Sequence, residues 1–181
     1  MTGKTIGVVG LGSIGSEVAR KARCLGMKVI ATKRRPSTKS DHVDELFSPE
    51  SLQELLAKSD LVVLTVPLTV ETKGMIGEDQ LRGMMKTAYP INVSRGKIIK
   101  EDSLIRALKE GWISSAGLDV FESEPLPPHS ELWSMKNVIV TPHMAGSTPH
   151  YWERATSIFE NLKRFAYNKP MINVVDKKAG Y

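Results

Sequence analysis

Three glycines near the N-terminus have the spacing of a turn that can hold a phosphate group. Gly10, Gly12 and Gly15 form the pattern G-x-G-x-x-G directly after the apolar residues 4–9. In such a turn the first glycine permits a tight bend, the second lets the backbone approach a pyrophosphate, and the third allows a helix to pack closely on a strand. The N-terminus of that helix then offers free N–H groups and a partial positive charge. The pattern predicts a dinucleotide site with contacts from Gly10, Gly12, Ser13, Ile14 and Gly15; the alternative is a plain glycine turn.

Three consecutive cations follow the second apolar run and indicate which dinucleotide the turn would hold. A domain that binds NAD usually carries an acidic residue about 20 positions after the first glycine, where it holds the 2′-hydroxyl of the ribose. This chain has Lys33, Arg34 and Arg35 there, with Ser37 and Thr38 close by. Cations attract a 2′-phosphate through charge-assisted hydrogen bonds, and an acid would repel it. We therefore predict NAD(P) as the cofactor, with NADP(H) favoured over NAD(H); the alternative is an ordinary solvated run of charge.

Strands and helices that alternate along the chain would position these residues. The first strand, the glycine turn, a helix and the second strand form a βαβ unit. Continuous apolar strands such as residues 61–66 are typical of a parallel sheet that is covered on both faces. The chain is thus expected to be an α/β protein, a doubly wound parallel sheet of about seven strands in a single domain. We expect strands at residues 4–9, 27–31, 61–66, 91–93, 112–120 and 138–140, and helices at 16–22, from 48 onward, at 78–82, 101–110 and 149–165.

Composition excludes several classes of protein. The chain has 181 residues, of which 41% are hydrophobic and 25% charged, as in ordinary globular domains rather than disordered or fibrous chains. The single cysteine, Cys24, excludes an internal disulfide, so a cytoplasmic location is the default expectation, and we expect this side chain to be packed. No apolar run approaches the roughly 20 residues of a membrane helix. The net charge of +5 permits nucleic-acid binding, but the basic residues are not interleaved with aromatic ones on one predicted face, so no nucleic-acid partner is expected.

Three further motifs carry a resemblance to a known family. They are NVSRG at residues 92–96, GLDVFESEP at residues 117–125 and TPHMAG at residues 141–146. Together with the glycine turn they closely resemble the nucleotide-binding domain of the D-isomer-specific 2-hydroxyacid dehydrogenases, a family that includes glyoxylate and hydroxypyruvate reductases and phosphoglycerate dehydrogenases. The resemblance implies a Rossmann-type domain over residues 1–175, followed by a tail at 176–181.

The resemblance also implies a reaction and three catalytic residues. The family interconverts 2-keto acids and D-2-hydroxy acids by hydride transfer at a nicotinamide. Arg95 matches the family position that binds the substrate carboxylate, a role that suits its planar fork of donors. His143 matches the proton donor and acceptor, and Glu124 matches the acid that keeps this histidine protonated. Asp119 matches a position near the nicotinamide.

Further residues are implied to lie beside the cofactor. The segment from Val66 to Thr72 looks like the family's loop after the fourth strand. No metal is expected. In addition to the turn and the basic cluster, the implied cofactor contacts are Val66, Pro67, Thr72, Val93, Ser94, Arg95, Asp119, His143 and Gly146.

Two departures from the family pattern bear on activity. Pro90 stands at the entry of the strand that leads to Arg95, where the family usually has an apolar residue and where proline removes one ladder donor. The family's substrate-binding domain is expected to be absent from this chain, so we expect weak activity or none from the chain alone. Two alternatives stay open: a non-catalytic dinucleotide-binding module derived from such an enzyme, and a methyltransferase-like domain with a similar turn.

The closing helix indicates self-association. Family members commonly dimerise through this domain, and large apolar side chains recur along residues 149–165. An apolar patch of this kind favours contact between copies of a chain. We expect a homodimer, with the contact made by Trp152, Ile158, Phe159, Leu162 and Phe165.

Overall fold

The computed structural model describes residues 1–34, 41–154 and 156–178. The chain divides into two compact units, Met1–His143 and Met144–Tyr181. The first unit contains the whole sheet, and the second contains the last two helices. Each unit is described by itself below.

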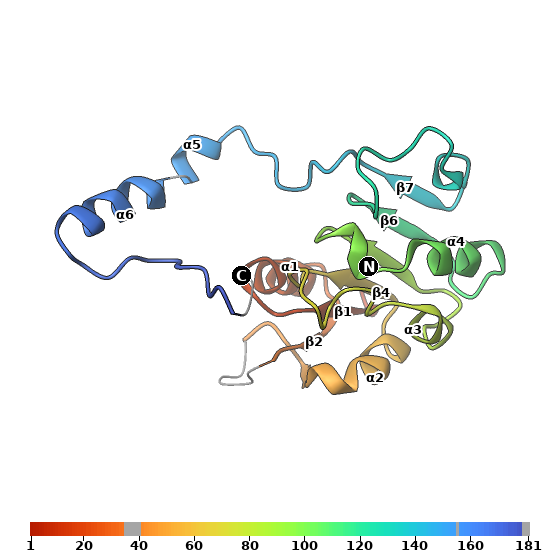
Figure 1. The fold of residues 1–181 in the computed structure, drawn as a ribbon. Helices are drawn as coiled ribbons and strands as arrows, with labels where there is room; N and C mark the ends of the chain where they lie inside the picture. The colour runs from red at the N-terminus through yellow and green to blue at the C-terminus, as the bar shows by residue number, and fades with distance from the viewer. Residues whose placement is uncertain (35–40, 155, 179–181) are drawn as a thin grey trace. The chain divides into compact units, whose positions relative to one another are not determined.

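The first unit is built on a parallel sheet of seven strands in the order β3-β2-β1-β4-β5-β6-β7 (Figure 1). All neighbouring strands pair in parallel, which confirms the predicted doubly wound sheet. The strand order changes direction between β1 and β4, and sheets of this type bind ligands beyond the carboxyl ends of the strands at that point. The strands are β1 (Thr5–Val9), β2 (Lys28–Thr32), β3 (Glu45–Phe47), β4 (Leu61–Leu64), β5 (Tyr89–Asn92), β6 (Ala116–Leu118) and β7 (Val138–Val140).

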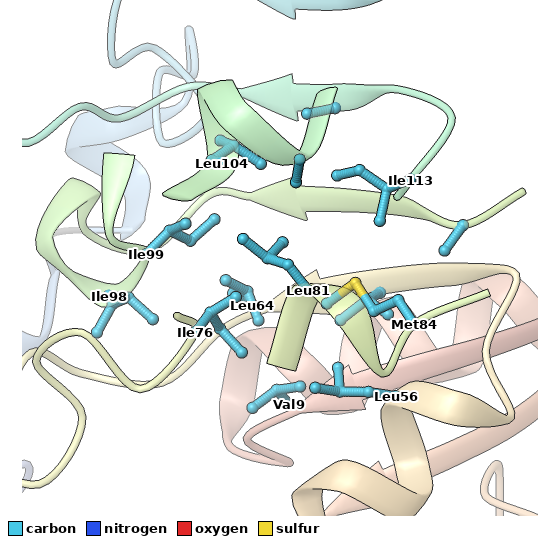
Figure 2. Packing of buried hydrophobic residues seen from close by; sticks show 14 of the residues in the cluster. Val9, Leu56, Leu64, Ile76, Leu81, Met84, Ile98, Ile99, Leu104 and Ile113 are labelled. Atoms are coloured by element: carbon cyan, nitrogen blue, oxygen red, sulfur yellow. The ribbon is translucent and has the colours of Figure 1, made fainter. Parts of the chain in front are cut away.

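Helices cover both faces of the sheet because successive strand residues point to opposite faces. Ile6 and Val8 of β1 pack in one buried cluster with Ala19 and Ala22 of α1 (Ser13–Cys24). Val9 packs in the other cluster, with residues of α2 (Leu52–Ala57), α3 (Glu78–Arg82) and α4 (Glu101–Lys109). Figure 2 shows part of this second cluster, in which Leu56, Leu64, Ile76, Leu81, Met84, Ile98, Ile99, Leu104 and Ile113 converge.

The structure corrects several expected boundaries. The helix expected from residue 48 begins as the 3₁₀ turn η1 (Pro49–Ser51) and continues as α2. The strand expected within residues 112–120 is β6. Of the helix expected over about residues 149–165, the structure describes α5 (Tyr151–Arg154) and α6 (Thr156–Ala166), and residue 155 between them lies outside the described part. Cys24 is exposed at the end of α1, so the expectation that it is packed was wrong.

Pro90 is accommodated inside β5. Tyr89 donates its N–H to the carbonyl of Asp60, on the β4 side of the strand. Since consecutive N–H groups of a strand point in opposite directions, the nitrogen of Pro90 faces the β6 side. Pairing between β5 and β6 begins only at Ile91 with Gly117, so the absent donor lies before the ladder starts.

Asp60 ties three strands together at the amino edge of the sheet. Its carboxylate accepts hydrogen bonds from Lys4 Nζ at 2.7 Å and from the N–H of Thr5 at 2.9 Å. Its own N–H donates to the carbonyl of Thr5, and its carbonyl accepts from Tyr89. The hydrogen bond from Lys4, followed by that from Thr5, lowers the pKa of the Asp60 carboxyl.

We predict that Asp60→Ala destabilises the protein by about 1–3 kcal/mol at neutral pH, because the N–H of Thr5 loses its partner. The folded-state pKa of Asp60 is depressed, so its contribution is present above the ordinary carboxyl pKa and is lost as the pH falls through the folded value. The difference between wild type and Asp60→Ala in urea unfolding should therefore shrink below about pH 4. Asp60→Asn keeps an acceptor oxygen and should fall between the two; a difference that is constant with pH would contradict this account.

Candidate functional site

The glycine turn adopts the geometry that its spacing predicts. Gly10 has a φ of +98°, which disfavours any residue with a side chain, and its N–H donates to Thr32 Oγ1 at 3.0 Å. A Cβ on Gly15 would lie 2.3 Å from the carbonyl oxygen of Gly10 and 2.9 Å from Thr65 Oγ1. A Cβ on Gly12 would meet no heavy atom of the described residues within 4 Å. The third glycine is therefore required by packing, whereas the second faces open space.

The start of α1 is suited to bind an anion. Gly12 is its N-cap residue and supplies no side-chain cap, and the first turn of this helix, all of which the structure describes, carries no acid. The first N–H groups of a helix have no partner within the helix and carry its partial positive charge. Ser13 and Ile14 follow the turn with exposed side chains. The helix terminus therefore presents polar donors at the carboxyl edge of β1.

Only part of the basic cluster lies within the described residues. Lys33 is half-buried and its N–H donates to the carbonyl of Phe47 at 3.0 Å, whereas Arg34 is exposed. Arg35, Ser37 and Thr38 lie outside the described residues. A hydrogen bond from the Thr69 hydroxyl, and to a smaller extent the charge of Arg34, lowers the pKa of Glu71. The positive charge of Arg34 therefore extends to the loop after β4.

The loop after β4 is held next to the glycine turn. Val66 Cγ1 lies 2.6 Å from the position that a Cβ on Gly10 would take. Thr72 donates its hydroxyl to the carbonyl of Pro67 at 2.6 Å and accepts the N–H of Thr69 at 2.7 Å. These bonds close residues 67–72 into a compact loop beside the turn.

Asn92, at the end of β5, fixes the segment that contains Arg95. Its side-chain Oδ1 accepts both the N–H and the hydroxyl of Ser94, at 3.1 and 2.8 Å, and its Nδ2 donates to the carbonyl of Arg95 at 3.0 Å. Val93 is half-buried, and the exposed Arg95 donates Nη1 to the carbonyl of Ser94 at 2.7 Å. The motif at residues 92–96 contains Asn92, but the sequence does not predict its role, because its hydrogen bonds depend on the turn that follows the strand.

His143 and Glu124 form a direct pair. His143 Nδ1 lies 2.7 Å from Glu124 Oε2, and Glu124 Oε1 accepts the N–H of Phe121 at 3.0 Å. The hydrogen bond from His143 is the largest cause that lowers the pKa of the Glu124 carboxyl; the N–H of Phe121 and the charge of Arg95 act in the same direction. The side chain of His143 is 46% exposed, so the ring is open to a ligand.

The backbone of β6 and β7 places His143. Its N–H donates to the carbonyl of Asp119 at 2.8 Å, and its φ is +51°. Asp119 is buried, and its Oδ1 accepts the hydroxyl of Thr141 at 2.5 Å. This bond joins the ends of the two strands. Thr141 is a second positioning residue to which sequence reasoning assigned no role.

The structure gathers the candidate residues of the first unit at one edge of the sheet. Each follows the carboxyl end of a strand, from the glycine turn after β1 to His143 after β7. Gly146 belongs to the second unit, so it is not placed relative to them. Within the described residues, no group of histidine, cysteine and acidic side chains could hold a metal ion. The arrangement combines anion-binding donors with a titratable histidine–carboxylate pair.

Comparison with known proteins gives a consistent result. Residues 1–145 match the family model described as D-isomer specific 2-hydroxyacid dehydrogenase, NAD binding domain. The glyoxylate reductase of Korarchaeum cryptofilum is 44% identical over 180 residues, which are 97% of this chain and 53% of the relative. The glyoxylate reductase of Thermococcus gammatolerans is 51% identical over 148 residues, which are 81% of this chain and 43% of the relative. The chain thus spans about half the length of these relatives.

Solved structures show the same fold. A D-isomer specific 2-hydroxyacid dehydrogenase from Xanthobacter autotrophicus Py2, in complex with NADPH and MES, is 40% identical with a TM-score of 0.93, over 98% of this chain and 73% of the other. An NADPH-dependent glyoxylate/hydroxypyruvate reductase from Sinorhizobium meliloti, in complex with NADP and sulfate, is 33% identical with a TM-score of 0.91, over 98% and 57%.

Two single-methyl substitutions should separate packing from ligand access. We predict that Gly15→Ala destabilises the fold by about 1–3 kcal/mol, because the new Cβ collides with the Gly10 carbonyl. Gly12→Ala adds the same methyl group in open space and should cost no more than about 1 kcal/mol. Urea unfolding of the two variants beside wild type measures the difference. Equal destabilisation would mean that the helix and the turn are not packed as described.

Proposed function

The chain belongs to the D-isomer specific 2-hydroxyacid dehydrogenase family, of which it contains the NAD-binding domain, and from this premise we propose its activity. We propose that it serves an oxidoreductase that interconverts a small 2-keto acid and the D-2-hydroxy acid by hydride transfer, with glyoxylate as the model substrate. The observation that carries the proposal is the 2.7 Å pair of His143 and Glu124 at the same sheet edge as the glycine turn and Arg95. The relatives named glyoxylate reductases support the substrate class.

The residues of the turn fit a dinucleotide. The open space at Gly12 and the uncapped start of α1 suit a pyrophosphate, and Arg34 suits a phosphate on the adenosine ribose. When bound, the nicotinamide supplies the hydride donor or acceptor. The loop that contains Val66, Pro67 and Thr72 and the segment of Val93 and Ser94 would line the bound cofactor.

Arg95 and His143 would handle the substrate. The guanidinium of Arg95 presents donors that match a carboxylate, and it would hold the keto acid in place. His143 would give a proton to the developing alkoxide during reduction and take it back during oxidation. Because Nδ1 faces Glu124, Nε2 is the ring nitrogen that would meet the substrate oxygen.

Glu124 would orient the histidine. Its lowered pKa keeps it ionised at neutral pH, so it accepts a hydrogen bond from Nδ1 and fixes the tautomer of the ring. Asp119 would lie on the cofactor side of the site and would not carry a proton. Its carbonyl accepts the N–H of His143 and so fixes the backbone of the histidine.

We propose that the cofactor is NADP(H) in preference to NAD(H). Lys33 and Arg34 stand where an acid would hold the 2′-hydroxyl of NAD. Two structural neighbours, from Xanthobacter autotrophicus Py2 and Sinorhizobium meliloti, are in complex with NADPH and NADP, which supports the preference. Arg35 would add to the same cluster.

Titration of the purified chain with NADPH and with NADH, followed by the fluorescence of the reduced nicotinamide, tests this preference. We predict tighter NADPH binding, and Arg34→Ala should weaken it by about 10-fold or more, the loss of one charge-assisted hydrogen bond, while NADH changes little. Gly12→Ala should weaken both cofactors. Arg106→Ala removes an arginine from the last turn of α4 and serves as the control. Equal dissociation constants for the two cofactors would overturn the preference, and binding of neither would overturn the proposed function.

We also propose a homodimer formed through α5 and α6, in a cytoplasmic protein. Among the described residues, no helix has both the length and the apolar character to cross a bilayer. Five large apolar residues of α5 and α6 are between 58% and 76% exposed: Trp152, Ile158, Phe159, Leu162 and Phe165. Exposed apolar patches of this kind favour association.

Sedimentation equilibrium should show a dimer for the wild-type chain. Phe165→Glu, which places a charge on the exposed side of α6, should convert it to a monomer, while Lys169→Glu, beyond the end of the helix, should not. A monomeric wild-type chain at high concentration would rule out this interface.

A further inference from the structure

Two glutamates from distant parts of the chain exchange hydrogen bonds beside the site. Glu101 is the first residue of α4, and its N–H donates to Glu122 Oε1 at 3.1 Å. The N–H of Glu122 donates to Glu101 Oε2 at 3.2 Å. The side chain of Glu122 thus satisfies one of the helix N–H groups that would otherwise have no partner. The pair joins the start of α4 to the loop after β6.

This exchange holds two carboxylates close together. Glu101 is partly buried, and burial, together with the neighbouring charges of Glu122 and Asp102, raises the pKa of its carboxyl. The partial positive charge at the start of α4 offsets part of the free-energy cost of placing two negative charges here. Lys100, the N-cap residue of α4, supplies no side-chain cap, so the carboxylate of Glu122 from the other segment takes that place.

The same two segments also meet at a second point. A Cβ on Gly96 would lie 1.9 Å from the carbonyl carbon and oxygen of Phe121, so only glycine fits against this backbone. Between Gly96 and Glu101 the chain is anchored by Ile98 and Ile99, which are buried in the cluster of Figure 2. The segment that begins at Arg95 is therefore fastened to residues 121 and 122 at both of its ends.

Phe121 connects this double contact to the histidine pair. Its carbonyl packs on Gly96, and its N–H donates to Glu124 Oε1 at 3.0 Å. The other oxygen of Glu124 meets His143 Nδ1. A shift of residues 121 and 122 would therefore move Glu124 away from His143, and would also move it relative to Arg95.

We propose that Glu101 and Glu122 are positioning residues that set the spacing between Arg95 and the Glu124–His143 pair. They act through the backbone of residues 121–124 and do not themselves touch substrate or cofactor. The inference rests on the proposed function, because Arg95, Glu124 and His143 are the residues that this function would use.

The position of the proton on the ring of His143 measures directly whether Glu124 is in place. At a pH where the ring is neutral, long-range ¹H–¹⁵N NMR measures which nitrogen carries the proton, and a hydrogen bond to Glu124 selects Nδ1–H. We expect Glu101→Ala and Glu122→Ala each to lower the ratio of Nδ1–H to Nε2–H at least about twofold, in the same direction as Glu124→Ala, which removes the acceptor of Nδ1–H. Glu101→Gln and Glu122→Gln retain an acceptor oxygen and should keep the wild-type ratio.

Control variants distinguish a role in positioning Glu124 from a general effect on the stability of the fold, and NADPH binding tests the proposed function separately. Glu110→Ala removes an acid that follows α4 and contacts Trp112 Nε1 and Arg106, and should leave the His143 ratio unchanged. NADPH titration of each variant shows that the glycine turn is intact. If the alanine variants fail to fold, Glu122→Asp, whose carboxylate is one methylene shorter, replaces them and should also lower the ratio.

The possible results distinguish failure of the positioning role from failure of the proposed function. A wild-type ratio in the folded alanine or aspartate variants of Glu101 and Glu122, while Glu124→Ala changes it, would overturn the positioning role and leave the proposed function standing. A wild-type chain that binds neither NADPH nor NADH would overturn the proposed function before the inference is reached. A ratio that alanine lowers and glutamine keeps would support the inference, because these variants differ in the acceptor oxygen that joins the two segments. An unchanged ratio in Glu110→Ala would show that loss of an acid elsewhere near α4 does not act on His143.

Discussion

Parallel pairing of all the strands brings every strand's carboxyl end to one edge of the sheet, and the site depends on this constraint. The turn of Gly10, the loop of Val66, the segment of Arg95 and the backbone of His143 each follow a different strand. Residues from positions 10 to 143 are thereby neighbours at one edge. In this chain the anion-binding donors follow β1, whereas the histidine–carboxylate pair follows β6 and β7.

Backbone geometry shapes one end of the site, and hydrogen-bonded side chains position the residues at the other end. At the glycine turn the absence of side chains matters: Gly15 packs on the Gly10 carbonyl, and Gly12 leaves room for a ligand. At the other end, buried polar groups do the positioning, with Asn92 fixing the Arg95 segment and Asp119 bonded to Thr141. Buried hydrogen bonds of this kind cost much to break, so they hold a functional residue more firmly than an exposed loop would.

The sequence predicts those elements of the fold that depend on residues close together in the chain. The glycine spacing, the apolar strands and the acidic starts of α3 and α4 all reflect local geometry, and the observed elements follow them closely. β3 was not located because three residues at a sheet edge leave no periodicity to detect. The candidate triad was reached through a family resemblance, since Arg95, Glu124 and His143 are far apart in sequence. The bonds of Thr141, Glu101 and Glu122 depend on tertiary contacts, which sequence patterns do not encode, and those of Asn92 depend on the conformation of the turn after β5.

The most direct test of the account is a map of amide shifts in the ¹H–¹⁵N spectrum as NADPH and then oxamate, an unreactive analogue of glyoxylate, are added to the chain. We expect NADPH to shift the amides of Gly10, Gly12, Ser13 and Arg34, and oxamate then to shift those of Arg95 and His143. Shifts confined to the opposite edge of the sheet, at Gly3, Gly26 and Asp60, or no shifts at all, would contradict it.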